Sequence, residues 1–268
     1  MSHGSRLSEP LIVVSVVSHR QGELVHALLD DIDRHCTENI QVVLTLNLPE
    51  SLPFEPGSFK YPVRVIRNER PKGFGANHNF AFRQIGSDYF CVANPDIRLD
   101  ECPFRKLRDC FSHTDAALAG PLVLSPQGNI EDNARRFPTP LRIAGKIIAR
   151  ARSLDYPVGD QPIRPDWLAG MFLLFRSGVF EEVNGFDERY FLYYEDVDIC
   201  ARVRLAGREI ALCPHARVVH HARRESHRNW RYLLWHVTSM LRFFCSGVFW
   251  RLAAAGLLGG RRPILKAP

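Results

Sequence analysis

The stretch "LIVVSVVSHRQGELVHALLDDIDRHCTENIQVVLTLN" (residues 11–47) decides the fold class. It opens and closes with apolar, β-branched runs, at 11–18 and 41–47, whose near-continuous hydrophobicity is typical of strands covered on both faces. Between these runs, apolar residues from Leu24 to Ile32 recur at helical spacing and mark one face of a helix. A strand, a helix and a second strand in this order predict a βαβ unit, and therefore an α/β domain.

The pattern of this first unit continues along the chain. Runs at 63–68, 89–95 and 168–175 predict three more strands, and the segments 74–86 and 102–111 predict two more helices. In a largely parallel sheet, ligands bind beyond the carboxyl ends of the strands. The first candidates for a site are therefore the polar residues that follow the predicted strands: Ser18, His19, Asn47, the segment 68–79, and Asn94 to Asp96.

The composition is that of a globular protein with a basic charge balance. The chain has 268 residues, 46% of them hydrophobic and 24% charged, which predicts one large domain or one domain with an appendage. Its net charge of +6 suits phosphates, nucleic acid or an anionic membrane face. The sequence contains no recognisable helix-turn-helix, RNA-recognition or zinc motif, so we expect no nucleic-acid partner.

Cysteine usage and the N-terminal segment bear on the cellular compartment. The seven cysteines form no C-x-x-C pair and lie mostly inside apolar runs, so they predict reduced core thiols in a cytosolic protein. Residues 1–10 are polar and short, which predicts a flexible N-terminus rather than a signal peptide.

Two short motifs follow predicted strands. "KGFGANHN" (72–79) lacks the third glycine of a dinucleotide fingerprint, but its glycines favour a close approach of the backbone to a ligand, with Asn77 and Asn79 as hydrogen-bond partners. The alternative is a plain glycine turn that opens a helix. "VANPDIRLD" (92–100) ends a strand with Asp96, which suits either a hard cation or an Asx-turn cap.

A third motif, "YFLYYEDVDICARVRLAG" (190–207), crowds acids beside aromatic residues. It predicts a helix over 195–205 that is closed by Gly207, with Asp198 and Arg202 paired on its surface. Acids in a first helical turn also suit the helix dipole. That explanation leaves the aromatic cluster unexplained, and an aromatic wall with a few polar groups is typical of a small-molecule pocket. The cluster comprises Trp167, Tyr190, Phe191, Tyr193 and Tyr194.

Three other segments carry expectations of their own. The stretch 125–165 is rich in Pro, Gly and Arg, and its weak periodicity predicts a binding loop or lid. Alternation along "CPHARVVHH" (213–221) puts His220 and His221 on opposite faces, so one of them points into a site if Asp96 lies nearby. The tail at 228–268 is apolar and aromatic with interspersed arginines. Its uncharged runs are too short to span a membrane. It predicts amphipathic helices on a membrane face, or else packing on the domain or a homodimer interface.

Taken in order, "VVSHR", "GFGANHN", "NPD", "LAGMFLLFR", "NGFDERYFLYYEDVDICARVRLAG" and "VVHH" resemble the family 2 glycosyltransferases, closest to their bacterial rhamnosyltransferase-like branch. The resemblance covers roughly residues 11–227. It implies an α/β GT-A fold, the Rossmann-like fold of nucleotide-diphospho-sugar transferases, with a mostly parallel sheet and a C-terminal helical extension.

The resemblance also implies a role for each matching residue. The enzymes of this family are inverting: an acceptor hydroxyl attacks the anomeric carbon of a nucleotide-activated sugar. By this resemblance, Asp196 would be the base and Glu195 would orient the acceptor. Asp96 would hold Mg²⁺ or Mn²⁺, and His220 would be a second metal ligand or a contact of the diphosphate. Acceptor contacts would come from Trp167, Gly170, Asp187 and Tyr194. Donor contacts would come from Ser18, Asn47, Asn68, Gly73, Phe74, Gly75, Asn79, Asn94 and Asp96.

Two departures from the family pattern modify these expectations. Leu46-Asn47 stands where the family has an acid-Asn pair, and Asn94 replaces the first acid of the D-x-D motif, so the cation would arrive with the substrate. The branch favours dTDP-rhamnose as the donor, with a UDP- or GDP-sugar as the alternative. It also favours a glycan or lipid-linked acceptor and a position at the cytoplasmic face of the plasma membrane. The alternative function is that of a non-catalytic carbohydrate-binding or scaffold protein that kept the fold.

Overall fold

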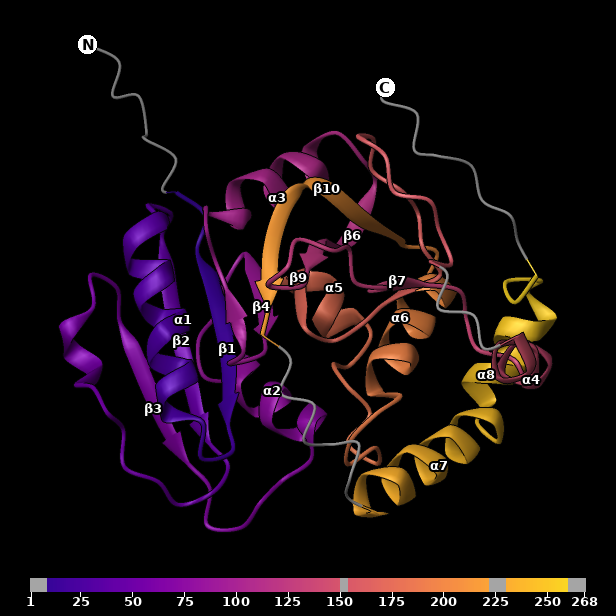
Figure 1. Ribbon diagram of the computed structural model, residues 1–268, viewed down its shortest axis with the longest axis horizontal. Coiled ribbons are helices and arrows are strands. Elements are labelled where there is room, and N and C mark those ends of the chain that lie inside the picture. The colour runs from indigo at the N-terminus through magenta and orange to yellow at the C-terminus, as the bar shows by residue number, and fades with distance from the viewer. Residues whose placement is uncertain (1–8, 150–153, 222–229, 260–268) are drawn as a thin grey trace.

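A computed structural model describes residues 9–149, 154–221 and 230–259 (Figure 1). The described residues form a three-layer α/β/α domain around an eight-stranded sheet of order β3-β2-β1-β4-β9-β6-β10-β5, plus a two-stranded ribbon of β7 and β8. The strands are β1 Ile12–Ser18, β2 Ile40–Leu46, β3 Val63–Arg67, β4 Tyr89–Ala93, β5 Ile97–Arg98, β6 Ala116–Leu124, β7 Ala134–Arg135, β8 Trp167–Leu168, β9 Phe172–Arg176 and β10 Glu209–His220. The α-helices are α1 Gly22–His35, α2 Phe74–Phe82, α3 Pro103–Ser112, α4 Pro140–Ala149, α5 Ser177–Glu182, α6 Glu195–Leu205, α7 Trp230–Phe244 and α8 Gly247–Ala254, with a 3-10 turn at Pro56–Ser58.

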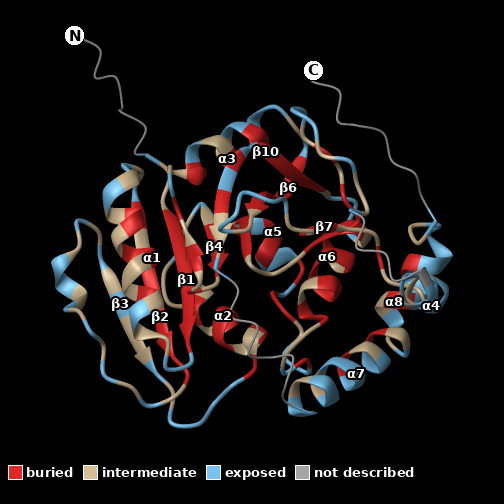
Figure 2. Cartoon of the chain, in the orientation of Figure 1, coloured by how far each residue is buried: buried red, intermediate tan, exposed pale blue. Residues whose placement is uncertain are grey.

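The sheet is mostly parallel, as predicted. Strands β3, β2, β1 and β4 run in one direction, and so do β6 and β10, whereas β9 and β5 run the opposite way. Every residue of β1 is buried, which explains its unbroken apolar sequence (Figure 2). Because the parallel strands end at one edge, the segments after β1, β2, β3 and β4 meet there.

Each face of the sheet has its own core. On one face, Leu28 of α1 and Phe104 of α3 belong to the same buried cluster as Val14 of β1. On the other, α5 and α6 pack through Phe180 and Val203 in a cluster that also holds Phe90 of β4.

The predicted strand 168–175 is wrong in one respect, because the chain turns inside it. Leu168 ends β8, Phe172 begins β9, and the N–H of Met171 bonds the carbonyl of Ala169 (2.9 Å) in the turn between them. The amide of Ala169 bonds the distant carbonyl of Asn133, so tertiary contacts redirect an apolar run that periodicity alone would continue.

The segment 125–165 is more regular than its composition predicted, since it contains β7 and the ten-residue helix α4. Leu141 and Ile148, seven residues apart in α4, are 86% and 82% exposed. These two side chains therefore lie on a face of α4 that is turned toward solvent.

The described part of the tail packs on the domain. Phe243 of α7 and Leu252 of α8 are buried in the core of the α6 face, and the Ser239 hydroxyl donates to the carbonyl of Leu192 (2.9 Å). The opposite side of α7 exposes a stripe of large apolar residues, namely Trp230, Leu233, Leu234, Val237 and Leu241. Within the described ranges, no helix has the length and apolarity needed to cross a bilayer.

The expectation that all seven cysteines are reduced is wrong for two of them. Cys110 of α3 and Cys213 of β10 form a disulfide, although 103 residues separate them in sequence. The pairing follows from α3 packing across β10, which spacing along the chain does not reveal. The other five cysteines, all in the described residues, are free thiols.

Candidate functional site

The carboxylate pair lies where α6 begins. Tyr193 and Tyr194, immediately before it, both have left-handed backbone conformations, with φ of 69° and 66°. Two consecutive non-glycine residues in this region are strained, and such strain concentrates at functional sites. Glu195 and Asp196 follow this strained pair in the first turn of α6.

The two carboxyl groups have different surroundings. Asp196 accepts hydrogen bonds from the backbone N–H groups of Gly170 (3.0 Å) and Val197 (2.8 Å). Glu195 is 5% exposed, and its Oε2 atom has no hydrogen-bond partner among the described residues. One carboxyl oxygen of Glu195 is therefore without a partner among these residues, whereas both oxygens of Asp196 accept from backbone amides.

These surroundings separate the pKa values of the pair. Burial raises the pKa of Glu195 well above its usual range, and the charge of Asp196 raises it further. Burial also raises the pKa of Asp196, but the amides of Gly170 and Val197 and the charge of Arg135 act in the opposite direction. The two amides and Arg135 favour the ionised form of Asp196, so Asp196 ionises before Glu195.

Asp196 opens into a pocket of about 320 Å³. Its walls come from the β7–β8 ribbon, α4, the loop before α6, and α7. The lining residues are Arg135, Arg136, Pro138, Arg142, Ile143, Lys146, Asp155, Trp167, Ala169, Tyr193, Tyr194, Asp196, Val197, His236 and Met240. Apolar walls with a few polar groups suit a small organic ligand such as a sugar.

The predicted acceptor residues divide into two groups. Trp167 and Tyr194 line the pocket, and Gly170 borders it through its bond to Asp196. Asp187 lies outside the lining, and its carboxylate binds the guanidinium of Arg189 at 2.6 Å. Glu195 is also outside the lining, which leaves Asp196 as the acid of the pair that reaches the pocket.

A second polar centre joins the ends of β4 and β10. Oδ2 of Asp96 lies 3.4 Å from Nε2 of His220, and Nδ1 of His220 lies 2.8 Å from Oε2 of Glu131. Burial lowers the pKa of His220, but hydrogen bonds to Asp96 and Glu131 outweigh burial and raise it above the usual value. Of the two histidines that alternation places on opposite faces, His220 has its side chain beside Asp96, whereas the backbone N–H of His221 donates to the carbonyl of Asp96 (2.9 Å).

This centre fits a divalent cation. Oδ1 of Asp96 is buried without a hydrogen-bond partner among the described residues, so one carboxylate oxygen is available. A histidine that binds a metal through one ring nitrogen usually forms a hydrogen bond to a carboxylate or carbonyl through the other, which fixes the orientation of the ring. Glu131 forms such a bond with Nδ1 of His220. Asp96 and His220 could therefore hold Mg²⁺ or Mn²⁺ together.

The predicted donor asparagines form a network at the ends of β2 and β3. Oδ1 of Asn47 accepts from the Asn68 side chain (2.7 Å) and from the backbone N–H of Lys72 (2.8 Å). Asn68 also donates to Asn77 (2.7 Å), and Ser18 accepts from the backbone of Gln21. The network fixes the loop before α2 against the carboxyl edge of the sheet.

The glycines of that loop approach protein. A Cβ on Gly73 would lie 2.9 Å from Cα of Phe191, and one on Gly75 would lie 2.6 Å from Cβ of Phe186. Both glycines therefore allow close packing against the loop that precedes α6, and their contact with a ligand stays a prediction. The side chain of Asn79 serves the same packing, since it bonds both the N–H and the carbonyl of Phe186.

Phe74 and Asn94 connect the two centres. The Phe74 ring would lie 3.5 Å from a Cβ on Gly170, beside Asp196. The backbone N–H of Asn94 donates to the carbonyl of Met171 (2.9 Å), which ties the end of β4 to the same turn.

Several residues of the site were not predicted individually. Glu131 and the basic residues of the pocket all lie in 125–165, where the composition predicted a binding loop without naming residues. His236 and Met240 belong to α7, and only tertiary packing brings them to the pocket.

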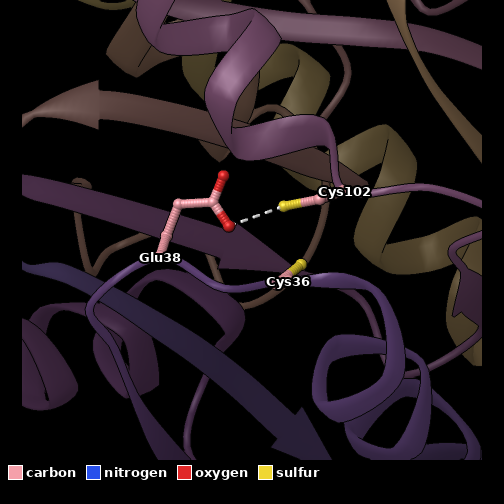
Figure 3. Close-up of side chains that lie close together, drawn as sticks. All are labelled: Cys36, Glu38 and Cys102. Atoms are coloured by element: carbon pink, nitrogen blue, oxygen red, sulfur yellow. Dashed lines mark hydrogen bonds between the residues drawn. The ribbon is translucent and has the colours of Figure 1, made fainter.

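A separate group of potential metal ligands comprises Cys36, Glu38 and Cys102, whose ligand atoms lie within 4.8 Å of one another (Figure 3). The Cys102 thiol donates to Glu38 (3.0 Å), and a hydrogen bond with Cys102, together with burial, raises the pKa of Cys36. The group lies just before β2 and α3, at the amino edge of the sheet, so it takes no part in the site described above.

The described residues, with their eight-stranded mixed sheet between helices, have the GT-A fold of nucleotide-diphospho-sugar transferases. Residues 57–236 match the family described as glycosyltransferase like family 2, and the chain belongs to that family. The family that the order of the motifs predicted is thereby confirmed.

Relatives and solved structures agree with this assignment. The chain is 33% identical over 186 residues to an N-acetylglucosaminyl-diphospho-decaprenol L-rhamnosyltransferase of Mycobacterium tuberculosis, a match that spans 60% of either protein. It is 26% identical to the rhamnosyltransferase WbbL of Escherichia coli, across 87% of this chain and 92% of WbbL. GalNAc-T7 with UDP, GalNAc and Mn²⁺ has a TM-score of 0.63 at 16% identity, covering 81% of this chain and 44% of GalNAc-T7. TarS of S. aureus has a TM-score of 0.55 at 12% identity, covering 91% and 72%. Both structures support the fold alone.

Proposed function

We propose that this protein transfers a sugar, with rhamnose favoured, from a nucleoside-diphosphate donor to a hydroxyl of a lipid-linked glycan acceptor, with inversion. The observation that carries the proposal is Asp196, a half-buried carboxylate held by two backbone amides in the lining of a pocket that Trp167, Tyr193 and Tyr194 also line. The rhamnosyltransferase relatives favour the sugar and the kind of acceptor.

In this mechanism Asp196 accepts the proton of the attacking hydroxyl while the oxygen displaces the nucleoside diphosphate from the anomeric carbon. A single displacement inverts that carbon. The bonds from Gly170 and Val197 hold the carboxylate in place, and its raised pKa makes it a better base than an exposed aspartate. Glu195 stays protonated and therefore adds no second negative charge.

The donor side rests on the Asp96–His220 centre. When bound, a divalent cation neutralises charge on the leaving diphosphate. Asp96 would bind it through Oδ1, and Glu131 would keep Nε2 of His220 directed toward the same place. The asparagine network beyond β2 and β3 would face the nucleoside, with Asn47 supplying the contacts that an acid-Asn pair makes in the family.

A membrane contact completes the proposal. The exposed apolar faces of α4 and α7 belong to the two helices that wall the pocket, and Trp230 and Trp250 are residues favoured at a membrane interface. A lipid surface there would deliver the lipid-linked acceptor to Asp196, which corresponds to peripheral binding at the cytoplasmic face of the plasma membrane.

The test is a donor screen with product analysis. The protein is incubated with dTDP-rhamnose, UDP-sugars and GDP-sugars, with and without Mn²⁺, and release of nucleoside diphosphate is measured with and without a lipid-linked acceptor. We expect acceptor-dependent release with dTDP-rhamnose, and NMR of the product should show an inverted anomeric centre. Donor binding without any release, across all donors, would instead support a non-catalytic carbohydrate-binding protein.

A further inference from the structure

The pocket beside Asp196 has a basic wall. Four lining residues, Arg135, Arg136, Arg142 and Lys146, are cationic, whereas Asp155 and Asp196 are the lining acids. With both acids ionised, four positive charges minus two negative charges leave the lining at +2. A neutral sugar gives no reason for this excess, which points to an anionic ligand.

Two of the four cations already have acid partners. Lys146 pairs with Asp155 at 2.8 Å, and Arg135 pairs with Asp132 at 3.2 Å while lying over the Trp167 ring. Because each of these cations is neutralised by a carboxylate, the two pairs attract an anionic ligand only weakly.

The other two cations, Arg136 and Arg142, form no ion pair with a carboxylate of the described ranges. The Arg142 guanidinium donates to the carbonyl of Phe137 (2.8 Å). Arg136 lies over the Tyr156 ring, and its buried Nε has no hydrogen-bond partner among the residues that the structure describes. A buried guanidinium nitrogen without an acceptor is costly, and a bound anion would satisfy it.

Diphosphate matches these two groups in charge and shape. A diphosphate that links a sugar to a lipid carries one negative charge on each phosphate, and guanidinium groups bind phosphate oxygens in bidentate fashion. Asp96, His220 and Asn47, the residues proposed for the donor, do not line this pocket. The anion therefore belongs to the acceptor and not to the nucleotide.

We propose that Arg136 and Arg142 bind the diphosphate of a sugar-diphosphate-lipid acceptor. This inference rests on the proposed function and adds to it a subsite for the acceptor's anionic linkage. The acceptor sugar then lies between the diphosphate and Asp196, against Trp167 and Tyr194. The lipid leaves the pocket between α4 and α7, where both helices expose apolar side chains.

Equilibrium binding without donor tests the subsite independently of turnover. Two probes are compared: an N-acetylglucosaminyl-diphospho-alkyl lipid, and an alkyl N-acetylglucosaminide of equal chain length without the diphosphate. We expect the full-length protein to bind the diphospho probe more tightly. Arg136→Gln and Arg142→Gln should each weaken that probe by roughly tenfold to a hundredfold, since each removes charge-assisted hydrogen bonds, and should leave the neutral probe unchanged.

The controls separate charge from folding. Arg105→Gln removes an exposed arginine of α3, outside the pocket, and should change neither affinity. Arg142→Lys keeps the charge and should retain part of the preference for diphosphate. Equal loss of affinity for both probes in the glutamine variants, or no preference in the unaltered protein, would overturn the proposal.

A competition arm distinguishes the two sources of diphosphate. If dTDP displaces the diphospho probe and loses its own affinity in Arg136→Gln and Arg142→Gln, the arginines serve the donor and the proposal is wrong. Transfer from dTDP-rhamnose is measured separately. Arginine-dependent binding without transfer would contradict the proposed enzyme function and still support the subsite. Transfer without arginine-dependent binding would support the enzyme function and contradict the subsite.

Discussion

The backbone N–H of Gly170 donates a hydrogen bond to Oδ2 of Asp196 at 3.0 Å. This bond joins the turn between β8 and β9 to the first turn of α6, two segments that lie 26 residues apart in the chain. It orients the carboxylate through the backbone, so among substitutions at position 170 proline, which has no N–H, is the one that removes it directly. The proposed base is thereby held by the fold itself.

Asp196→Asn should lower kcat by about 10²- to 10⁴-fold, because an amide cannot take the proton of the acceptor hydroxyl. Its oxygen still accepts from Gly170, so the fold and the affinity for the donor should be preserved. Steady-state kinetics and donor titration measure the two effects. Asp109→Asn, at an exposed position of α3, is the matched control. A variant that keeps most of its kcat would transfer the role of base to Glu195 or Asp187.

Arg135→Gln should move the acidic limb of the kcat profile to higher pH. The base acts when ionised, so activity falls as pH falls through the pKa of Asp196, which burial raises above 3.8. The Arg135 charge lowers that pKa, so removing it leaves the carboxylate protonated up to a higher pH. Arg135→Lys should keep the limb near its original position. A limb that stays in place in Arg135→Gln would show that the arginine does not act on Asp196.

Asp96→Ala should weaken donor binding and abolish its dependence on Mn²⁺, since it removes the carboxylate proposed to bind the cation. Glu131→Gln should lower the affinity for Mn²⁺ by about 10- to 100-fold, because the glutamate orients His220 from behind. Isothermal titration with and without metal measures both effects. Asp100→Ala, an exposed acid four residues further along, controls for loss of charge. Donor affinity that is equally metal-dependent in Asp96→Ala would assign Asp96 to a turn cap.

Glu195→Gln should flatten the pH dependence of stability. The folded-state pKa of Glu195 is raised above 4.5, so its contribution is fully present below that value and is lost as pH rises through the folded-state pKa. Glutamine does not titrate, and the variant should therefore gain stability relative to the unaltered protein as pH rises. Urea unfolding at about pH 5 and about pH 8 measures the difference. Glu181→Gln, at an exposed position of α5, should show no such trend. A stability difference between the two proteins that is constant across pH would mean that Glu195 has its ordinary pKa in the folded protein.

Serine in place of Leu233 and Leu241 should reduce flotation of the protein with vesicles of phosphatidylglycerol and phosphatidylethanolamine. Both side chains lie on the exposed stripe of α7, at 66% and 54% exposure, so the substitutions leave the buried face intact. Methionine at the same two positions keeps the stripe apolar and should preserve flotation. Unaltered protein that stays in solution but forms a dimer disrupted by the serine variant would assign the stripe to a second copy of the chain.

The sequence alone determined the α/β class, because unbroken apolar strands alternating with amphipathic helices have few other ways to bury their surfaces. It also predicted three candidate acids, Asp96, Glu195 and Asp196, which stand in local motifs that resemble those of the family. The helix over 195–205 and the Asp198–Arg202 pair were predicted for the same reason, and the pair lies at 2.8 Å; the predicted surface position is wrong, because Asp198 is buried. Interactions within a few residues are legible in sequence.

Only the tertiary structure decided what those residues meet. The turn at Ala169–Met171, the antiparallel β9 and the Cys110–Cys213 pair depend on contacts between segments far apart in the chain. Glu131 lies 89 residues from His220, and the basic wall of the pocket comes from a segment whose composition suggested a loop. The roles of Glu195 and Asp196 differ because burial and backbone amides surround them differently. Burial and long-range hydrogen bonds belong to the folded chain, so no local pattern of residues encodes them.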